Sequence, residues 1–222
     1  MNRGLKLLAL AYGTLTLGVL IWGVVRAFGG DAAPTAGQTL ILLHLPAACN
    51  ALLGALVVCV ASVAYLGRRR PRWDHLGHAA AEVTVLNASV LLISGMCWAK
   101  VVWGTWWLWS PRLSFSLILW GLYVLYLVMR SGIRSPERRA MLAAVYGAIA
   151  FLDVPLLYLA VNLLPDIHPT TGAATKSAGG LLGVWMTGVT LLSVGLIITE
   201  WRGRRRLGRG DPSDEARMEG GA

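Results

Sequence analysis

The chain has little charge, and it lacks the signatures of several large function classes. Only 14% of its 222 residues are charged and 56% are hydrophobic, which is less charge and more apolar character than a soluble domain usually has. No nucleotide-binding P-loop, G-x-S-x-G nucleophile motif or H-E-x-x-H zinc motif occurs. We therefore expect a membrane protein that is not an enzyme, and any dependence on ATP must come from a partner.

Cysteine is also scarce, and none is placed for redox chemistry. Cys49, Cys59 and Cys97 lie in apolar segments, and the sequence has no C-x-x-C pair and no C-x-x-C-H haem-attachment site. No set of histidine, cysteine or acidic residues has the spacing of a zinc site. We interpret the cysteines as small packing residues.

Long apolar runs occupy most of the chain. A spanning helix needs roughly 20 mainly apolar residues, and six runs qualify: residues 7–25, 40–66, 79–98, 113–129, 140–164 and 178–199. The sequence therefore predicts an all-α, polytopic membrane protein with six transmembrane helices. The six-helix membrane domain would cover residues 1–202, with a tryptophan-rich external loop at 98–112 and a disordered cytoplasmic tail at 203–222.

The basic residues set the expected orientation. The net charge is +9, but the arginines gather at alternate helix ends rather than along one polar face, which argues against a nucleic-acid partner. By the positive-inside rule both termini are expected in the cytoplasm of a bacterial inner-membrane protein. Loops near 27–39, 99–112 and 165–178 would then face outward. A cleavable signal peptide at residues 1–30 is the alternative reading of the first run.

Small residues and one proline are expected to shape the helix bundle. Gly54, Gly121 and Gly183 would let neighbouring helices approach closely. Pro155 removes a backbone donor and should kink the fifth span, where Asp153 could satisfy freed donors. With Glu82 as the other acid inside a span, too few acids remain for a proton or ion relay.

The most unusual segment is Trp103-Gly-Thr-Trp-Trp-Leu-Trp-Ser-Pro-Arg112, which holds four of the ten tryptophans. If it forms an interfacial helix, Trp103, Trp106 and Trp107 share one face. An aromatic belt that anchors the chain at the membrane interface is one interpretation. A flat ligand with propionate groups, held beside the cations Lys100 and Arg112, is the other.

The four histidines fall into two pairs. His75 and His78 lie in the cytoplasmic loop, where a solvated surface role is expected, whereas His44 and His168 flank the tryptophan loop on the outer side. An ionisable group at such a depth suggests function. Two imidazoles beside an aromatic floor suit a porphyrin with six-coordinate iron. A hydrogen-bonded helix-end histidine is the alternative for His44.

The tryptophan segment resembles a known signature. It is similar to the WWD motif, W-G-x-W-W-x-W-D-x-R-L, of haem-handling proteins in cytochrome c maturation, and the six-span layout resembles the haem exporter protein C family in particular. His44-Leu-Pro-Ala-Ala resembles the family's H-V-P-A-A element. Asp153-Val-Pro155 and His168-Pro169 resemble its V-P element and its later outer histidine.

The resemblance implies a site and partners. His44 and His168 would be the axial ligands of a non-covalently bound bis-histidine haem, and Trp103, Trp106, Trp107 and Trp109 would form its platform. Such a protein presents haem to a periplasmic haem chaperone, beside the ATPase and permease subunits of an ABC transporter and a small membrane partner. The chain departs from the family at Ser110, which replaces the motif's aspartate, and at Leu163-Leu164, which replaces an aromatic pair.

These observations favour a haem-binding and transfer protein of the bacterial inner membrane. A permease subunit that translocates haem or another amphipathic molecule is the second hypothesis, and it requires polar spans that line a path. A structural anchor whose aromatic loop docks a partner is the third, and it requires no bound pigment.

Overall fold

The protein is built from α-helices. The computed structural model describes residues 36–165 and 171–207, together with isolated helical residues between Leu7 and Ile21. Within these described parts every regular element is an α-helix. The helices are α2 (Ala36–Arg68), α3 (Pro71–Trp103), α4 (Pro111–Gly132), α5 (Pro136–Ala150), α6 (Asp153–Leu163) and α7 (Thr171–Leu207).

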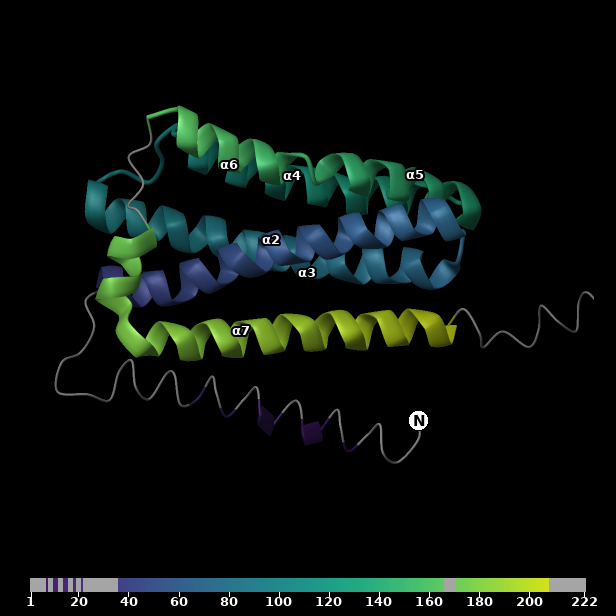
Figure 1. Cartoon of the computed structure of the whole chain (residues 1–222), viewed down its shortest axis with the longest axis horizontal. Coiled ribbons are helices and arrows are strands. Elements are labelled where there is room, and N and C mark those ends of the chain that lie inside the picture. Colours follow the sequence, from purple (N-terminus) through teal and green to yellow (C-terminus); the bar gives the residue numbers. More distant parts are fainter. Residues whose placement is uncertain are drawn as a thin grey trace, which may run out of the picture.

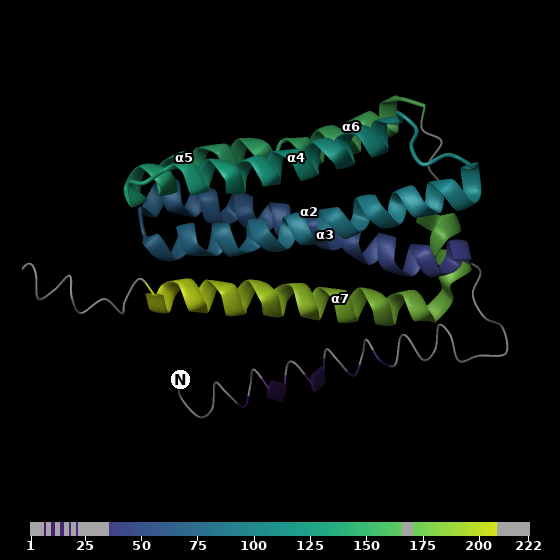
Figure 2. The same cartoon turned by 180° about the vertical axis from the view of Figure 1, so that it is seen from behind.

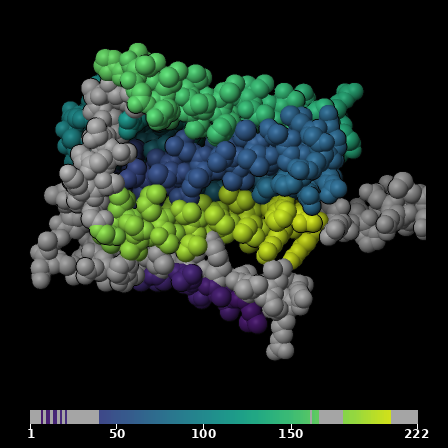
Figure 3. All heavy atoms as spheres, viewed as in Figure 1, coloured from purple at the N-terminus to yellow at the C-terminus, as the bar shows by residue number. Residues whose placement is uncertain are grey.

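The helices run nearly parallel to one axis (Figure 1). α2 and α3 lie side by side in the middle, α4, α5 and α6 cover one side of the pair, and α7 lies on the other (Figure 2). The space-filling view shows the same order, with α2 between α5 and α6 above and α7 below (Figure 3). The connection from α3 to α4, the end of α6 and the start of α7 share one end of the bundle. The connections from α2 to α3 and from α4 to α5 share the other.

Five helical stretches of the described residues are long and apolar enough to cross a membrane: Leu40–Arg68, Pro71–Trp103, Pro111–Gly132, Pro136–Ala160 and Gly180–Arg206. They correspond to the second to sixth predicted spans. The first predicted span, 7–25, lies almost entirely outside the described residues. Three of the helices, α3, α4 and α5, begin at a proline in the first helical position, because proline has no donor to lose there. The helices therefore start before the apolar runs do.

The predicted kink in the fifth span is a short interruption of the helix, at which Phe151 and Leu152 keep right-handed φ and ψ angles. α5 ends at Ala150 and α6 begins at Asp153, with a turn at Phe151 and Leu152. Pro155 cannot donate to the carbonyl of Phe151, four residues earlier. That carbonyl instead accepts from the Val154 amide at 3.0 Å. The interruption thus lies one turn before Pro155, at the carbonyl to which a residue with an N–H would have donated.

α2 and α3 pack closely because small residues line their contact. Ala51, Ala55, Ala80, Ala81 and Ala88 are all fully buried there or in the adjoining core. Gly54 faces Thr84, and a Cβ atom added to Gly54 would lie directly on the Thr84 hydroxyl. The predicted role of Gly54 in close approach is therefore confirmed. For Gly121 and Gly183 it is wrong, because an added Cβ would meet no atom of the described residues within 4 Å.

Side-chain amides join α7 to the central pair. Asn50 on α2 donates to the Thr190 hydroxyl at 3.1 Å, and Asn87 on α3 donates to the Ser193 hydroxyl at 3.1 Å. Each amide also donates to a carbonyl of its own helix at 2.9 Å. The NH2 groups of both asparagines thus have acceptors inside the bundle, as a low-dielectric environment requires.

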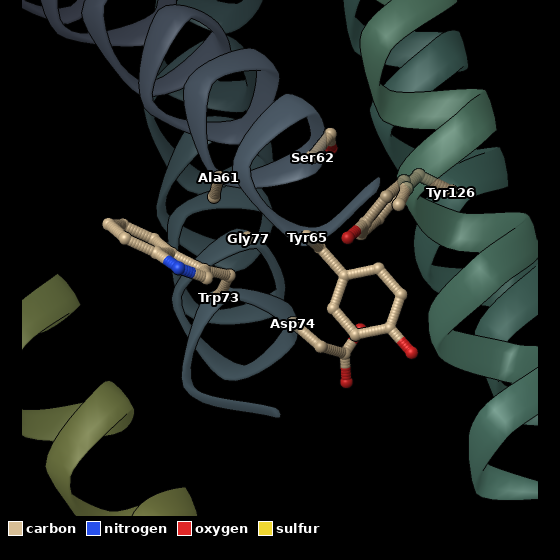
Figure 4. A pocket seen from close by; sticks show the side chains of 8 residues that line it. Ala61, Ser62, Tyr65, Trp73, Asp74, Gly77 and Tyr126 are labelled. Carbon is tan, nitrogen blue, oxygen red and sulfur yellow. The ribbon is translucent and has the colours of Figure 1, made fainter. Parts of the chain in front are cut away.

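The end of the bundle with the α2–α3 and α4–α5 connections is rich in charge. Asp74 on α3 pairs with Arg130 on α4, and Glu82 on α3 pairs with Arg204 on α7 at 2.6 Å. Figure 4 shows Asp74 and Tyr126 pointing into the same narrow crevice between the helices. α7 continues to Leu207, so residues 203–207 are helical rather than part of a disordered tail, since Arg204 is held against α3. Residues 208–222 lie outside the described residues.

Candidate functional site

His44 lies in the first third of α2, at the end of the bundle where α3 meets α4. Its half-buried ring faces α3. The Nδ1 atom lies 3.1 Å from the carbonyl oxygen of Leu91 and 3.3 Å from the hydroxyl oxygen of Ser94. A carbonyl oxygen only accepts hydrogen bonds, so Nδ1 carries the ring proton. In the neutral imidazole the ring lone pair is therefore on Nε2.

The tryptophan segment is an irregular connection between α3 and α4. α3 ends at Trp103 because Gly104 has a positive φ of 77°, and its amide donates back to the Lys100 carbonyl at 3.2 Å. A left-handed residue at this position terminates a helix. Residues 104–110 contain no helix. The interfacial helix that would align Trp103, Trp106 and Trp107 on one face does not form.

The indoles pack in two perpendicular pairs instead. The ring centroids of Trp98 and Trp103 are 5.0 Å apart with an interplanar angle of 86°. Those of Trp107 and Trp109 are 5.7 Å apart with an angle of 78°. Edge-to-face contacts of this kind are favourable for aromatic rings. Trp109 is 78% exposed and Trp106 is 57% exposed, so a wide aromatic surface faces the surroundings of the bundle.

Ser110 has a local structural role at the start of α4. Its φ and ψ are −104° and 160°, and its hydroxyl accepts from the Leu113 amide at 3.5 Å. Its carbonyl accepts from the Ser114 amide at 3.0 Å. Serine and aspartate are both preferred N-cap residues. The serine that replaces the motif's aspartate can therefore still begin α4.

A cavity of about 480 Å³ lies under the tryptophan segment, between α3 and α4. Its lining is apolar apart from one hydroxyl and the indole nitrogens, and consists of Ser89, Leu92, Ile93, Met96, Trp107, Trp109, Leu117 and Trp120. Successive residues turn by about 100° around a helix. Positions 89, 92, 93 and 96 of α3 therefore face away from positions 91, 94 and 95, which face His44. The structure joins Trp107 and Trp109 to this cavity and joins His44 to the opposite face of α3.

The two cations of the segment differ in their surroundings. Lys100 donates to the Gly104 carbonyl at 2.9 Å, and its ammonium lies 5.9 Å from the Trp106 ring centroid. Arg112 is half-buried in the first turn of α4. Lys100 thus helps to cap the C-terminal end of α3, because a cation near the last turn of a helix can donate to carbonyls that lack a backbone partner.

His168, the second predicted ligand, lies outside the described residues, in the connection between α6 and α7. Both helix ends that flank this connection lie at the same end of the bundle as His44 and the tryptophan segment. Within the described part of the chain, no group of three histidine, cysteine or acidic residues gathers to hold a metal ion.

A sequence profile of the Heme exporter protein C family matches residues 2–200. The chain belongs to the heme exporter protein C family. The Heme exporter protein C of Paracoccus denitrificans is 32% identical over 200 residues, 84% of this chain and 81% of the relative. That of Rhodobacter capsulatus is 35% identical with the same coverage. A cytochrome c biogenesis protein CcsA of Prochlorococcus marinus is 36% identical over 96 residues, 43% of this chain and 29% of that protein.

The predicted family is thus confirmed, and with it the coarse assignment to haem handling in cytochrome c biogenesis and to a multi-pass membrane protein. For this member of the heme exporter protein C family, the structure adds residues that the sequence did not single out. Leu91, Ser94 and Gly95 meet His44 from α3. A serine and a glycine in succession within an apolar run could have signalled a helix surface on which another group packs closely.

Proposed function

We propose that this chain binds haem at the outer face of a bacterial inner membrane and delivers it to a periplasmic haem chaperone. His44 and His168 would hold the haem iron, and the tryptophan segment with Arg112 would form the platform. Because Trp107 and Trp109 lie on the face of α3 opposite His44, the haem would have to reach across the end of α3. The chain works beside the ATPase and permease subunits of an ABC transporter and a small membrane partner. Family membership supports this role, and the resemblance of the WWD motif supports the assignment of residues.

The observation that carries the proposal is the anchored ring of His44. A metal-binding histidine usually donates its other ring N–H to a carbonyl or carboxylate, which fixes the tautomer and orients the ring. His44 has this arrangement, with Nδ1 bound at 3.1 Å to the Leu91 carbonyl. The ring is thus anchored from another helix, by a residue 47 positions away in the sequence.

The absorbance spectrum tests the proposal. We expect the purified protein to show the Soret and α/β bands of a bis-histidine haem, and His44→Ala and His168→Ala each to lose the six-coordinate spectrum. His75→Ala is the matched control, because His75 lies at the opposite, charged end of the bundle near Asp74. A colourless wild type, or histidine variants with unchanged bands, would contradict the proposal.

The permease alternative has less support, because the polar groups of the spans are engaged between helices. Asn50 and Asn87 bind Thr190 and Ser193, and Glu82 binds Arg204. Asp153 is buried beside the break between α5 and α6. A translocation path needs polar groups that face one another across an opening. These groups instead hold α7 in place or lie singly.

A further inference from the structure

The surface of α3 that contacts His44 leaves room for an imidazole ring. In an α-helix the side chains three and four residues on lie beside a given carbonyl. For Leu91 these residues are Ser94 and Gly95. Because one is small and the other has no side chain, the Leu91 carbonyl is accessible to a donor from α2.

Gly95 leaves room for the ring itself. A Cβ atom added to Gly95 would lie 2.9 Å from Cε1 of His44 and 3.3 Å from its Nδ1. Contacts under 3.0 Å force a displacement, so any larger residue at position 95 pushes the imidazole away from α3. The glycine is therefore needed for the ring position and not only for helix packing.

The hydroxyl of Ser94 is oriented to accept. It donates to the Val90 carbonyl at 2.6 Å, which leaves its lone pairs for the Nδ1–H of His44 at 3.3 Å. Ser94 is 5% exposed, so water does not readily replace it. Nδ1–H thus has two acceptors, a carbonyl and a hydroxyl, both on α3.

We propose that Ser94 and Gly95 are positioning residues for a haem-ligating His44. They hold its ring plane against α3, keep the proton on Nδ1 and make Nε2 a stronger donor to iron. Acceptor hydrogen bonds to the distal ring nitrogen raise ligand basicity, and their loss costs roughly 10- to 100-fold in metal affinity. This inference rests on the proposed function, because it requires that His44 binds the haem iron.

Haemin titration and redox titration of the purified full-length protein test the inference. We expect Ser94→Ala to weaken haemin binding about 10-fold and to raise the midpoint potential, since a weaker imidazole donor stabilises ferric iron less. Ser94→Thr keeps the hydroxyl and should restore both values toward wild type. Gly95→Ala should weaken binding at least as much as Ser94→Ala.

The matched control is Ser62→Ala. Ser62 is 3% exposed and lies on α2, the helix that carries His44, but 18 residues separate the two, about 27 Å along the helix. It should leave haemin affinity and potential unchanged. Thermal unfolding of each variant without haem shows whether the fold is retained.

The outcomes separate the two proposals. If His44→Ala keeps the wild-type bands, the proposed function fails, and this inference fails with it. If His44→Ala loses the bands while Ser94→Ala and Gly95→Ala match wild type in affinity and potential, only the positioning role is overturned.

A second experiment tests the hydrogen bond without relying on Gly95. In His44→Gly, imidazole added from solution should restore the six-coordinate spectrum at about 10-fold lower concentration than 1-methylimidazole. Only imidazole has an N–H to donate to α3. The preference should shrink in the His44→Gly/Ser94→Ala double variant. Equal affinities for the two bases in His44→Gly would overturn the inference.

Discussion

Arg130 and Asp74 form a two-pronged ion pair between α4 and α3. Nη1 lies 2.6 Å from Oδ1 and Nη2 lies 2.9 Å from Oδ2. The Arg130 side chain is 4% exposed and that of Asp74 is 11% exposed. Parallel charge-assisted bonds of this kind are among the stronger ones in proteins. Because both groups are buried, neither can be removed without leaving the other charge unpaired.

We therefore expect Asp74→Ala to destabilise the protein by about 3 kcal/mol, the usual cost of breaking a buried pair. The measurement is the free energy of unfolding in detergent. Arg134→Ala is the matched control, since Arg134 is an exposed arginine of the connection between α4 and α5 and should change stability by less than about 0.5 kcal/mol. If Asp74→Ala lowers the free energy of unfolding no more than Arg134→Ala does, the ion pair of Asp74 with Arg130 does not stabilise the protein.

Ser110 should tolerate aspartate but not alanine. Loss of an N-cap oxygen costs about 1 kcal/mol, whereas serine and aspartate are nearly equivalent caps. Ser110→Ala should therefore lower stability by about that amount and Ser110→Asp should stay near wild type. Ser116→Ala serves as control, because that hydroxyl bonds only within α4, to the Arg112 carbonyl. A large loss in Ser110→Asp would mean that the position has a role beyond the cap.

Gly54 and Gly121 should respond in opposite directions to alanine. At Gly54 the new methyl group meets Thr84, and overpacking of a tight interface costs roughly 1–3 kcal/mol. At Gly121 no atom in the described part of the chain lies within 4 Å of an added Cβ, so Gly121→Ala should stabilise α4 by up to about 1 kcal/mol through helix propensity. Thermal unfolding in detergent compares the two. A neutral Gly54→Ala would indicate that α2 and α3 can separate without cost.

The orientation can be tested by labelling single cysteines. In a background with Cys49, Cys59 and Cys97 replaced by alanine, we expect Thr105→Cys to react with a membrane-impermeant maleimide on intact spheroplasts. Arg134→Cys should react only after lysis, because the arginine-rich end of the bundle is expected in the cytoplasm. The reverse pattern would place the tryptophan segment inside.

Much of the fold could be predicted because lipid restricts the choices. A chain in a bilayer must satisfy its backbone within helices, so apolar runs located the five spans of the described residues, and Pro155 located the break between α5 and α6. Helix ends depended on local chemistry that hydropathy does not measure. Gly104 ended α3 and prevented the interfacial helix. Glu82 on α3 binds Arg204 near the end of α7, and this helix continues to Leu207.

The candidate site was predictable only in part. His44 stood out because an ionisable group inside an apolar run is costly and rarely accidental. Ser94 and Gly95 did not, since the relative height of α2 and α3 determines which residues meet, and no periodicity within one helix encodes it. The tryptophans were found by composition, but the separation of Trp107 and Trp109 from His44 by α3 follows from helix rotation. The ligand role of His168 stays a prediction.

The two amide contacts of α7 have a consequence for where its first residues lie. Between helices surrounded by lipid, apolar contacts discriminate poorly between alternative registers. Sliding α7 by one turn, about 5.4 Å, would separate Asn50 from Thr190 and Asn87 from Ser193 and leave four polar groups to find new partners in hydrocarbon. The pair of amides therefore fixes the position of α7 along its own axis relative to α2 and α3. It fixes the height at which the chain enters α7, at the same end of the bundle as the start of α2.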